Sequence, residues 1–154
     1  QWLKPGTGRM AIVMPNGLLN NPGLGYLRQW LLSKAQILAV VDMHRNLFMP
    51  GNDTQTSMVL LRRKAPGEPD RDYPIFMAIA DSVGHDKRGK TTYKRNPDGS
   101  LVLAEKEVTH TVGGEVQKLK VLEPIVDDEL EDIAEAYHKW LASMTEPRQA
   151  FRVS

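Results

Sequence analysis

The sequence of 154 residues contains no cysteine. That absence excludes a disulfide framework, a thiolate metal site and a cysteine nucleophile together. No apolar run approaches the roughly 18 residues that a helix needs to cross a bilayer, and no charged-then-apolar leader begins the chain. We therefore expect no membrane contact and a cytoplasmic location. The formal net charge is only +1, so attraction to nucleic acid would have to come from local clusters of basic residues.

The first third of the chain predicts an α/β arrangement. Met10–Met14 is apolar at every position, which is typical of a strand covered on both faces of a parallel sheet, with a neighbour on each side. Asn21 is a favourable N-cap and Pro22 a favourable first residue of a helix that ends near Lys34. Ile37–Val41 is again fully apolar. Strand, helix and strand thus follow one another at the spacing of a parallel crossover.

The middle of the chain predicts two more apolar segments. A polar loop over residues 43–55 leads to a strand at Ser57–Leu61. A linker rich in proline, glycine and charge follows, and Ile75–Ala80 is expected to form another strand or buried segment. Because 41% of all residues are hydrophobic, these elements are expected to share one ordinary globular core.

The last third predicts a turn, a weak strand region and a helix. Asn96–Gly99 has the residues of a tight turn, in which Gly99 accepts a positive φ, so a short hairpin is expected there. Residues 104–125 indicate strand only weakly. From Asp127 an apolar stripe at helical spacing predicts an amphipathic helix that ends before Pro147.

Few patterns in the sequence indicate a nucleotide-binding, metal or catalytic site. The glycines near the beginning of the chain fit neither the dinucleotide-binding nor the phosphate-loop spacing. The histidines are scattered and lack a second ligand-type residue at the spacing of a zinc site, so we predict no metal site and interpret them as surface residues: His44, His85, His110 and His138. The acids at the start of the last helix are explained by the helix dipole rather than by acid–base catalysis.

Two features allow both a structural and a functional interpretation. Phe48 stands in the polar loop just after the end of a predicted parallel strand, where ligands of α/β sheets bind, but an aromatic residue there can also anchor its loop to the core. The second feature is a basic loop that is either a solvated surface or a contact for phosphates, with the side chains Lys87, Arg88, Lys90, Lys94 and Arg95.

Several segments in the same order resemble a known family. Leu3–Gly17 (LKPGTGRMAIVMPNG) and the helix that follows are similar to the later half of the catalytic domain of adenine-specific DNA methyltransferases. The likeness is strongest to the modification subunit of type I restriction systems. It continues through Ile37–Asp42, Leu47–Pro50 and Thr56–Leu61, and further segments at 76–80 and 84–89 are also similar to that family.

The resemblance implies a fold for the whole chain. The expected fold class is α/β, the C-terminal portion of a Rossmann-like, S-adenosylmethionine-dependent methyltransferase sheet. Its last strands would include a final antiparallel one near Ser57–Leu61, followed by a β-hairpin extension and a C-terminal helix. Residues 1–65 would then belong to the sheet, 66–126 to the basic loop and hairpin extension, and 127–146 to the helix, all within one structural domain.

The resemblance also implies an activity. Members of the family flip an adenine out of the duplex and methylate its exocyclic amino group, with S-adenosylmethionine as methyl donor. Phe48 followed by Pro50 matches the aromatic residue and proline that stack on the flipped base. The basic loop would contact DNA. The implied partners are DNA, the upstream half of the methyltransferase, a DNA-specificity subunit and a restriction subunit.

The chain departs from the family pattern in two ways. The glycine-rich cofactor motif and the Asn/Asp-Pro-Pro-aromatic catalytic motif do not occur in these 154 residues. Locally, His44 stands where proline is common and Gln55 where a basic residue often precedes Thr-Ser. We therefore expect the chain to be part of a methyltransferase, to bind the cofactor mainly through the missing half and to transfer no methyl group alone. The alternative is a non-catalytic α/β module that binds DNA or protein.

Overall fold

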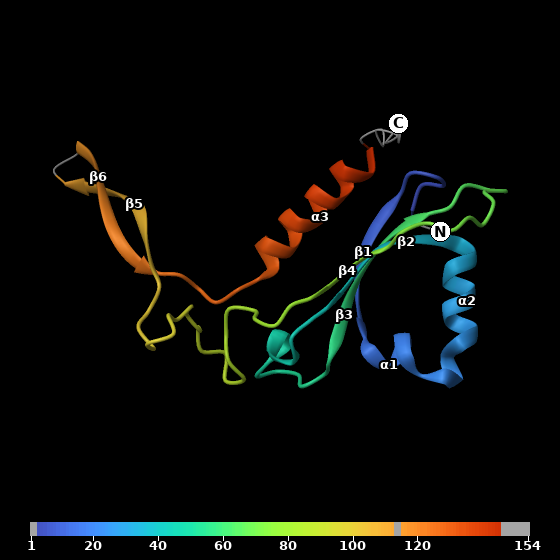
Figure 1. Ribbon diagram of the computed structural model, residues 1–154, viewed down its shortest axis with the longest axis horizontal. Helices are drawn as coiled ribbons and strands as arrows, with labels where there is room; N and C mark the ends of the chain where they lie inside the picture. Colours follow the sequence, from blue (N-terminus) through green and yellow to red (C-terminus); the bar gives the residue numbers. More distant parts are fainter. Residues whose placement is uncertain (1–2, 113–114, 146–154) are drawn as a thin grey trace, which may run out of the picture.

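The computed structural model describes residues 3–112 and 115–145 (Figure 1). The ends predicted for the first and last segments, residues 1 and 146, lie outside the described residues. In chain order the elements are β1 (Arg9–Pro15), α1 (Asn16–Asn20), the 3₁₀ turn η1 (Pro22–Leu24), α2 (Gly25–Lys34), β2 (Ala35–Asp42), η2 (Arg45–Phe48), β3 (Thr56–Arg63), β4 (Phe76–Ile79), β5 (Leu103–Val112), β6 (Glu115–Pro124) and α3 (Leu130–Thr145).

The main sheet has four strands in the order β1-β3-β2-β4. β3 is antiparallel to both β1 and β2, so β1 and β2 are parallel to each other with β3 between them. The predicted antiparallel strand at Ser57–Leu61 is therefore present. It is not the last strand of the sheet, however, because β4 pairs in parallel with β2 at the far edge. The segment predicted as an extension thus contributes one strand to the main sheet.

The position of β1 differs from the expectation. We predicted a strand buried on both faces with a neighbour on each side, and for the described residues this prediction is wrong. β1 forms one edge of the sheet, its partner among these residues is β3, and six of its seven residues are exposed. The apolar side chains of Met10, Ile12 and Val13 are 37%, 37% and 42% exposed. An all-apolar strand becomes buried only when a second neighbouring strand and its covering layer are present.

Two clusters of buried side chains form the core, one on each face of the sheet. Ile37, Val59 and Leu61 pack together with Leu31 of α2. On the other face, Val41, Met43 and Ala80 pack with side chains of α3. Figure 1 shows α2 and α3 on opposite sides of the strands. The sheet therefore has a helix on each face, and the carboxyl ends of β1 and β2 lie at the same edge.

Both predicted helices are present, with small shifts at their beginnings. The side chain of Asn21 accepts a hydrogen bond from Gly23 N, and η1 precedes α2, which ends at Lys34 as predicted. α3 begins at Leu130, where the backbone N–H donates to Asp128 Oδ1. The ring of Phe76 in β4 lies 5.3 Å from Tyr137 and 5.7 Å from Trp140. These ring contacts attach α3 to the sheet.

The segment after the basic loop forms a two-stranded ribbon. The predicted turn is confirmed: Gly99 has φ +85° and its N–H donates to Asn96 O. The weakly predicted strands at 104–125 are β5 and β6, which pair along their whole length. The two ends of the ribbon are joined at its base, where Ile125 N donates to Val102 O at 2.9 Å. In Figure 1 it extends away from the main sheet.

Within residues 3–112 and 115–145, no helix combines the length and the apolar character needed to cross a bilayer.

Candidate functional site

The loop between β2 and β3, residues 43–55, has a fixed shape, and we name it the Phe48 loop. The His44 ring begins η2 by accepting a hydrogen bond from Asn46 N through Nδ1. Gln55 Nε2 donates to Met43 O, which joins the two ends of the loop. Both residues that depart from the family pattern are thus involved in shaping the backbone. The peptide bond before Pro50 is cis.

An exposed ion pair closes the same loop. Arg45 donates from Nε and from a terminal nitrogen to the two carboxylate oxygens of Asp53, at 2.5 and 2.8 Å. The hydrogen bond from the guanidinium holds the pKa of Asp53 below its ordinary value. Because both partners are more than half exposed, the pair orders the loop without adding much stability.

Phe48 and Leu47 have different environments at the tip of η2. The side chain of Leu47 packs against the buried cluster of Val41, Met43 and Ala80, so it anchors the loop to the core. Phe48 is 44% exposed, and within the described residues no other aromatic ring pairs with it. Phe48 is thus the more exposed of these two neighbouring residues. An exposed aromatic face on an ordered loop is available to a flat ligand.

A polar network that was not predicted from the sequence joins the strand ends beneath this loop. Asn16, which follows β1, donates from Nδ2 to Asp42 Oδ1 at 2.9 Å. The buried hydroxyl of Ser57 lies 2.8 Å from Asn16 Oδ1 and 3.2 Å from Asp42 Oδ1. One network thus connects β1, β2 and β3 at the carboxyl edge. The only sequence signal was a polar residue at each strand end, at positions far apart in the chain.

The first part of the basic loop is a preorganised turn over residues 86–90, which we name the basic turn. Asp86 Oδ1 accepts hydrogen bonds from the backbone N–H groups of Arg88 (2.8 Å) and Lys90 (2.9 Å). These bonds lower the pKa of Asp86. Gly89 has φ +76° and donates its N–H to Asp86 O. The turn therefore holds Lys87, Arg88 and Lys90 in exposed positions.

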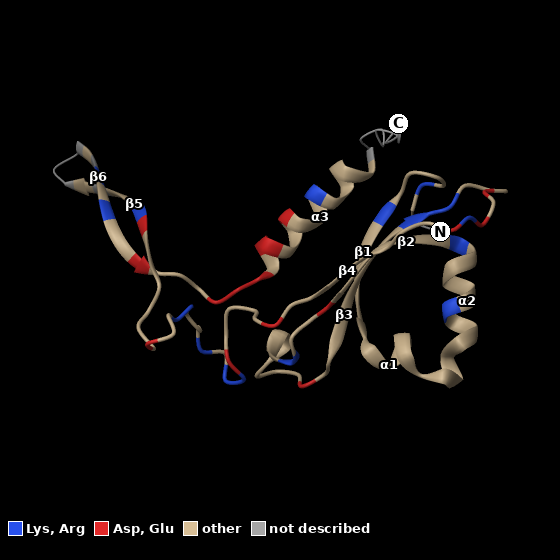
Figure 2. Cartoon of the chain, viewed as in Figure 1, with Lys and Arg blue, Asp and Glu red and all other residues tan. Residues whose placement is uncertain are grey.

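The five predicted basic residues fall into two groups. Lys87, Arg88 and Lys90 form no salt bridge with an acid in the described part of the chain. Lys94 lies 3.6 Å from Asp132 of α3, and Arg95 donates to Gly99 O. Figure 2 shows the basic residues between the main sheet and the ribbon, and the acidic start of α3. Within the described residues, the cations of the loop without an acidic partner are therefore the three of the basic turn and Arg95, whose bond to a carbonyl oxygen leaves its charge unneutralised.

The structure brings the basic turn and the Phe48 loop into contact. A Cβ atom added at Gly89 would lie 3.2 Å from Pro50 Cδ, so the two backbones approach closely. An open groove between them is lined by Met49 on one side and by His85 and Thr91 on the other. Pro50 of the Phe48 loop and Gly89 of the basic turn are thus neighbours in space, although the loop and the turn are far apart in sequence.

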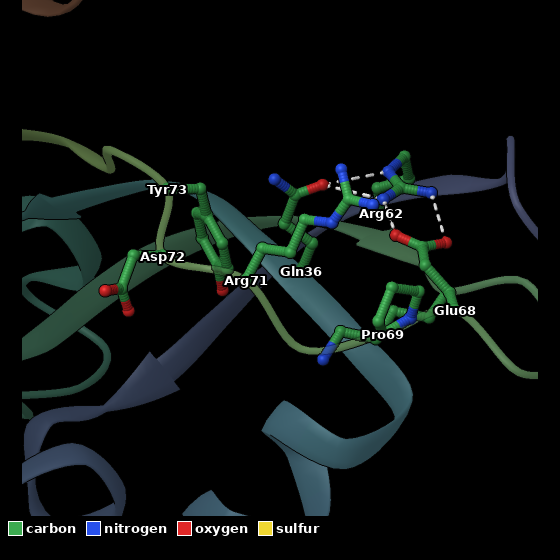
Figure 3. Close-up of a pocket in the computed structure, with 8 residues that line it drawn as sticks. Gln36, Arg62, Glu68, Pro69, Arg71, Asp72 and Tyr73 are labelled. Carbon is green, nitrogen blue, oxygen red and sulfur yellow. Dashed lines mark hydrogen bonds and ion pairs between the residues drawn. The ribbon is translucent and has the colours of Figure 1, made fainter.

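A second pocket lies at the other end of β2. Its side chains fasten the linker after β3 to the sheet, and we name this arrangement the Arg62 clamp. The pocket encloses about 400 Å³ and is lined by residues of β2, β3 and the linker that follows (Figure 3). Arg62 donates to Gln36 Oε1, to Gly6 O and to both oxygens of Glu68. All its N–H groups face acceptors within the protein, so this guanidinium fastens the linker to the sheet and is not free to bind an anion.

This clamp predicts a pH-dependent contribution to stability. The hydrogen bond from Arg62, and then that from Ala65 N, lower the pKa of Glu68 from 4.5 to about 2. A carboxylate with a depressed pKa stabilises the fold above its unfolded pKa and loses that contribution as the pH falls from 4.5 toward about 2. Glu68→Gln should therefore unfold more easily than the parent near neutral pH, and this difference should shrink on acidification. Urea unfolding of both proteins across this range tests it, and a constant difference would contradict the role of the ionised carboxylate.

One comparison with known proteins identifies a family that covers these elements. The family described as N-6 DNA Methylase matches residues 3–99, which include β1 to β4, the Phe48 loop, the basic turn and the Asn96–Gly99 turn. A search of curated proteins finds no match. The family match covers more than half of the chain and contains the whole main sheet. This protein therefore belongs to the N-6 DNA methylase family.

Proposed function

We propose that this chain forms the base-binding side of a site-specific DNA methyltransferase, which transfers a methyl group from S-adenosylmethionine to the exocyclic amino group of a flipped-out adenine. The observation that carries the proposal is the exposed ring of Phe48 at the carboxyl edge of the sheet, with Leu47 serving as the anchor. An extruded base has lost its stacking partners, and an aromatic face can return roughly 1–3 kcal/mol of that loss.

The residues of this chain position the base and do not perform the methyl transfer. The ring of Phe48 stacks on one face of the adenine, and η2 with its His44 cap keeps the ring at the edge of the sheet. The network of Asn16, Asp42 and Ser57 keeps the three strand ends together beneath the loop. Preorganisation of this kind favours one orientation of the bound base over others.

The described residues do not fit S-adenosylmethionine, which supplies the methyl group when it is bound. The glycine-rich cofactor motif of the family does not occur in these 154 residues. Asp42 at the end of β2 already accepts hydrogen bonds from Asn16 and Ser57. We therefore assign cofactor binding to a polypeptide segment that pairs with β1.

The open edge of β1 supports such a pairing. Arg63 N donates to Gly8 O at 2.8 Å, and Asn16 N donates to Gln55 O at 3.0 Å. Because the ladder of an antiparallel pair alternates, the even-numbered residues of β1 bond to β3, and Ala11 and Val13 direct their backbone groups to the open side. The exposed apolar side chains described above lie on the same strand. A further strand would pair with these outward backbone groups, and its own layer of helices would cover the exposed apolar side chains.

The basic turn gives a direct test of DNA binding. Changing Lys87, Arg88 and Lys90 to Gln together should reduce the salt dependence of binding to single-stranded DNA, by a slope of about 0.7 for each phosphate that is no longer neutralised. Lys94→Gln should change the slope less, because Lys94 already pairs with Asp132. Lys118→Gln, on the distant ribbon, is the matched control. Fluorescence anisotropy at several salt concentrations measures the slopes, and a slope unchanged in the triple variant would eliminate the turn as a phosphate-binding element.

A further inference from the structure

The groove between the Phe48 loop and the basic turn has the lining of a nucleotide subsite. It is a wide, open depression of about 500 Å³. Met49, Val83 and Val126 supply apolar walls, and the ring of His85 and the hydroxyl of Thr91 supply polar groups. A mixed lining of this kind suits a ligand with a flat apolar ring and a few polar atoms. Met49, which lines the groove, directly follows Phe48 in the chain.

The polar groups of the groove are oriented by the turn itself. His85 Nδ1 lies 3.1 Å from Asp86 O, and since a carbonyl oxygen only accepts, this nitrogen is the donor. Nε2 of the neutral ring is then an acceptor, suited to an amino group of a base. Backbone bridging between His85 and Thr91 holds both residues on the same short hairpin. The recognition groups are therefore fixed before a ligand arrives.

The basic turn borders the groove through Gly89, which is one of the lining residues. Lys87, Arg88 and Lys90 follow His85 within five residues, and the bonds to Asp86 fix the backbone of the turn. The close approach of Gly89 to Pro50 fixes the distance between the turn and the Phe48 loop. The turn that carries the cations is therefore adjacent to the groove.

We propose that this groove binds the nucleotide adjacent to the extruded adenine on the same strand, with its base against His85 and its phosphate at the basic turn. This inference rests on the proposed function, because it takes Phe48 as the site of the adenine. It adds a second nucleotide subsite, which binds the unpaired nucleotide next to the extruded adenine.

The test compares deoxyadenosine with the dinucleotide d(ApA), by NMR titration of the full 154-residue chain. d(ApA) should bind about tenfold more tightly than deoxyadenosine and should shift the amide signals of Gly89 and Thr91. His85→Ala should reduce this preference to about twofold or less, whereas His85→Gln, which retains an acceptor, should restore part of it. Thr91→Val is the second variant, to be used if His85→Ala does not fold. Lys118→Gln should keep the full preference.

The outcomes separate the subsite from the proposed function. Equal affinities for the two ligands, or an undiminished preference for d(ApA) in both His85→Ala and Thr91→Val, would overturn the subsite. Loss of deoxyadenosine binding in Phe48→Ala, with no effect of the groove variants, would support stacking and contradict the groove. If neither ligand binds, both proposals are overturned.

Discussion

Replacing Phe48 with Ala should weaken binding of an unpaired adenine by about 5- to 150-fold, because stacking on an aromatic face contributes roughly 1–3 kcal/mol per base. The free energy of unfolding should fall by only about 1 kcal/mol, because 44% of the residue is already exposed. Binding to an oligonucleotide with a mismatched adenine, and urea unfolding, measure the two quantities. Phe48→Trp keeps an aromatic face and should bind nearly as well as the parent.

The neighbouring residue provides the matched control. Leu47→Ala removes a side chain packed against Val41, Met43 and Ala80, so it should lower the free energy of unfolding by about 2 kcal/mol. The two variants should therefore have different profiles: Phe48→Ala loses base binding and keeps most of its stability, and Leu47→Ala loses more stability. If Phe48→Ala is the more destabilised one and binds adenine normally, the ring is a loop anchor and the base-stacking role is wrong.

Replacing Val13 with Pro should weaken assembly of the active methyltransferase while the chain keeps its own sheet. The N–H of Val13 points to the open side of β1, so proline removes no bond to β3 but blocks a strand pairing there. Proline leaves the partner carbonyl of the lost ladder bond unpaired, which costs about 1–3 kcal/mol, on the order of a 5- to 150-fold loss of assembled enzyme. Methyl transfer by the complete enzyme measures the loss, and circular dichroism of the 154-residue chain checks its fold.

The control for this edge is Val13→Thr, which keeps the backbone donor and a β-branched side chain. It should retain most of the activity. Full activity of Val13→Pro would show that no strand pairs with β1 through this position, and the proposed assembly would then be wrong.

Local signals in the sequence predicted the elements well. Asn21 and Pro22 set the beginning of the α2 region, and Gly99 adopts the positive φ that its turn requires, because these choices depend on residues within a few positions of each other. The Asp86 side chain that builds the basic turn is a further local signal, an aspartate three residues before a glycine, from which no turn was predicted.

Strand order and contacts between distant residues could not be predicted from such local signals. The insertion of β3 between β1 and β2 depends on pairing between distant segments, and hydrophobic patterns do not specify which strands are adjacent. The close approach of Gly89 to Pro50, and the network of Asn16 with Ser57, join residues about 40 positions apart. The site is therefore evident only once the fold has brought these residues together.

Our central claim is that this chain binds the base, whereas another polypeptide segment binds the cofactor and performs the chemistry. Methyl transfer from labelled S-adenosylmethionine to DNA tests it most directly. The 154-residue chain alone should give no labelled N6-methyladenine, and adding a polypeptide that carries the glycine-rich and Asn/Asp-Pro-Pro-aromatic motifs of the family should produce it. Methylation by the chain alone would contradict the account, because it would place cofactor binding and chemistry within these 154 residues.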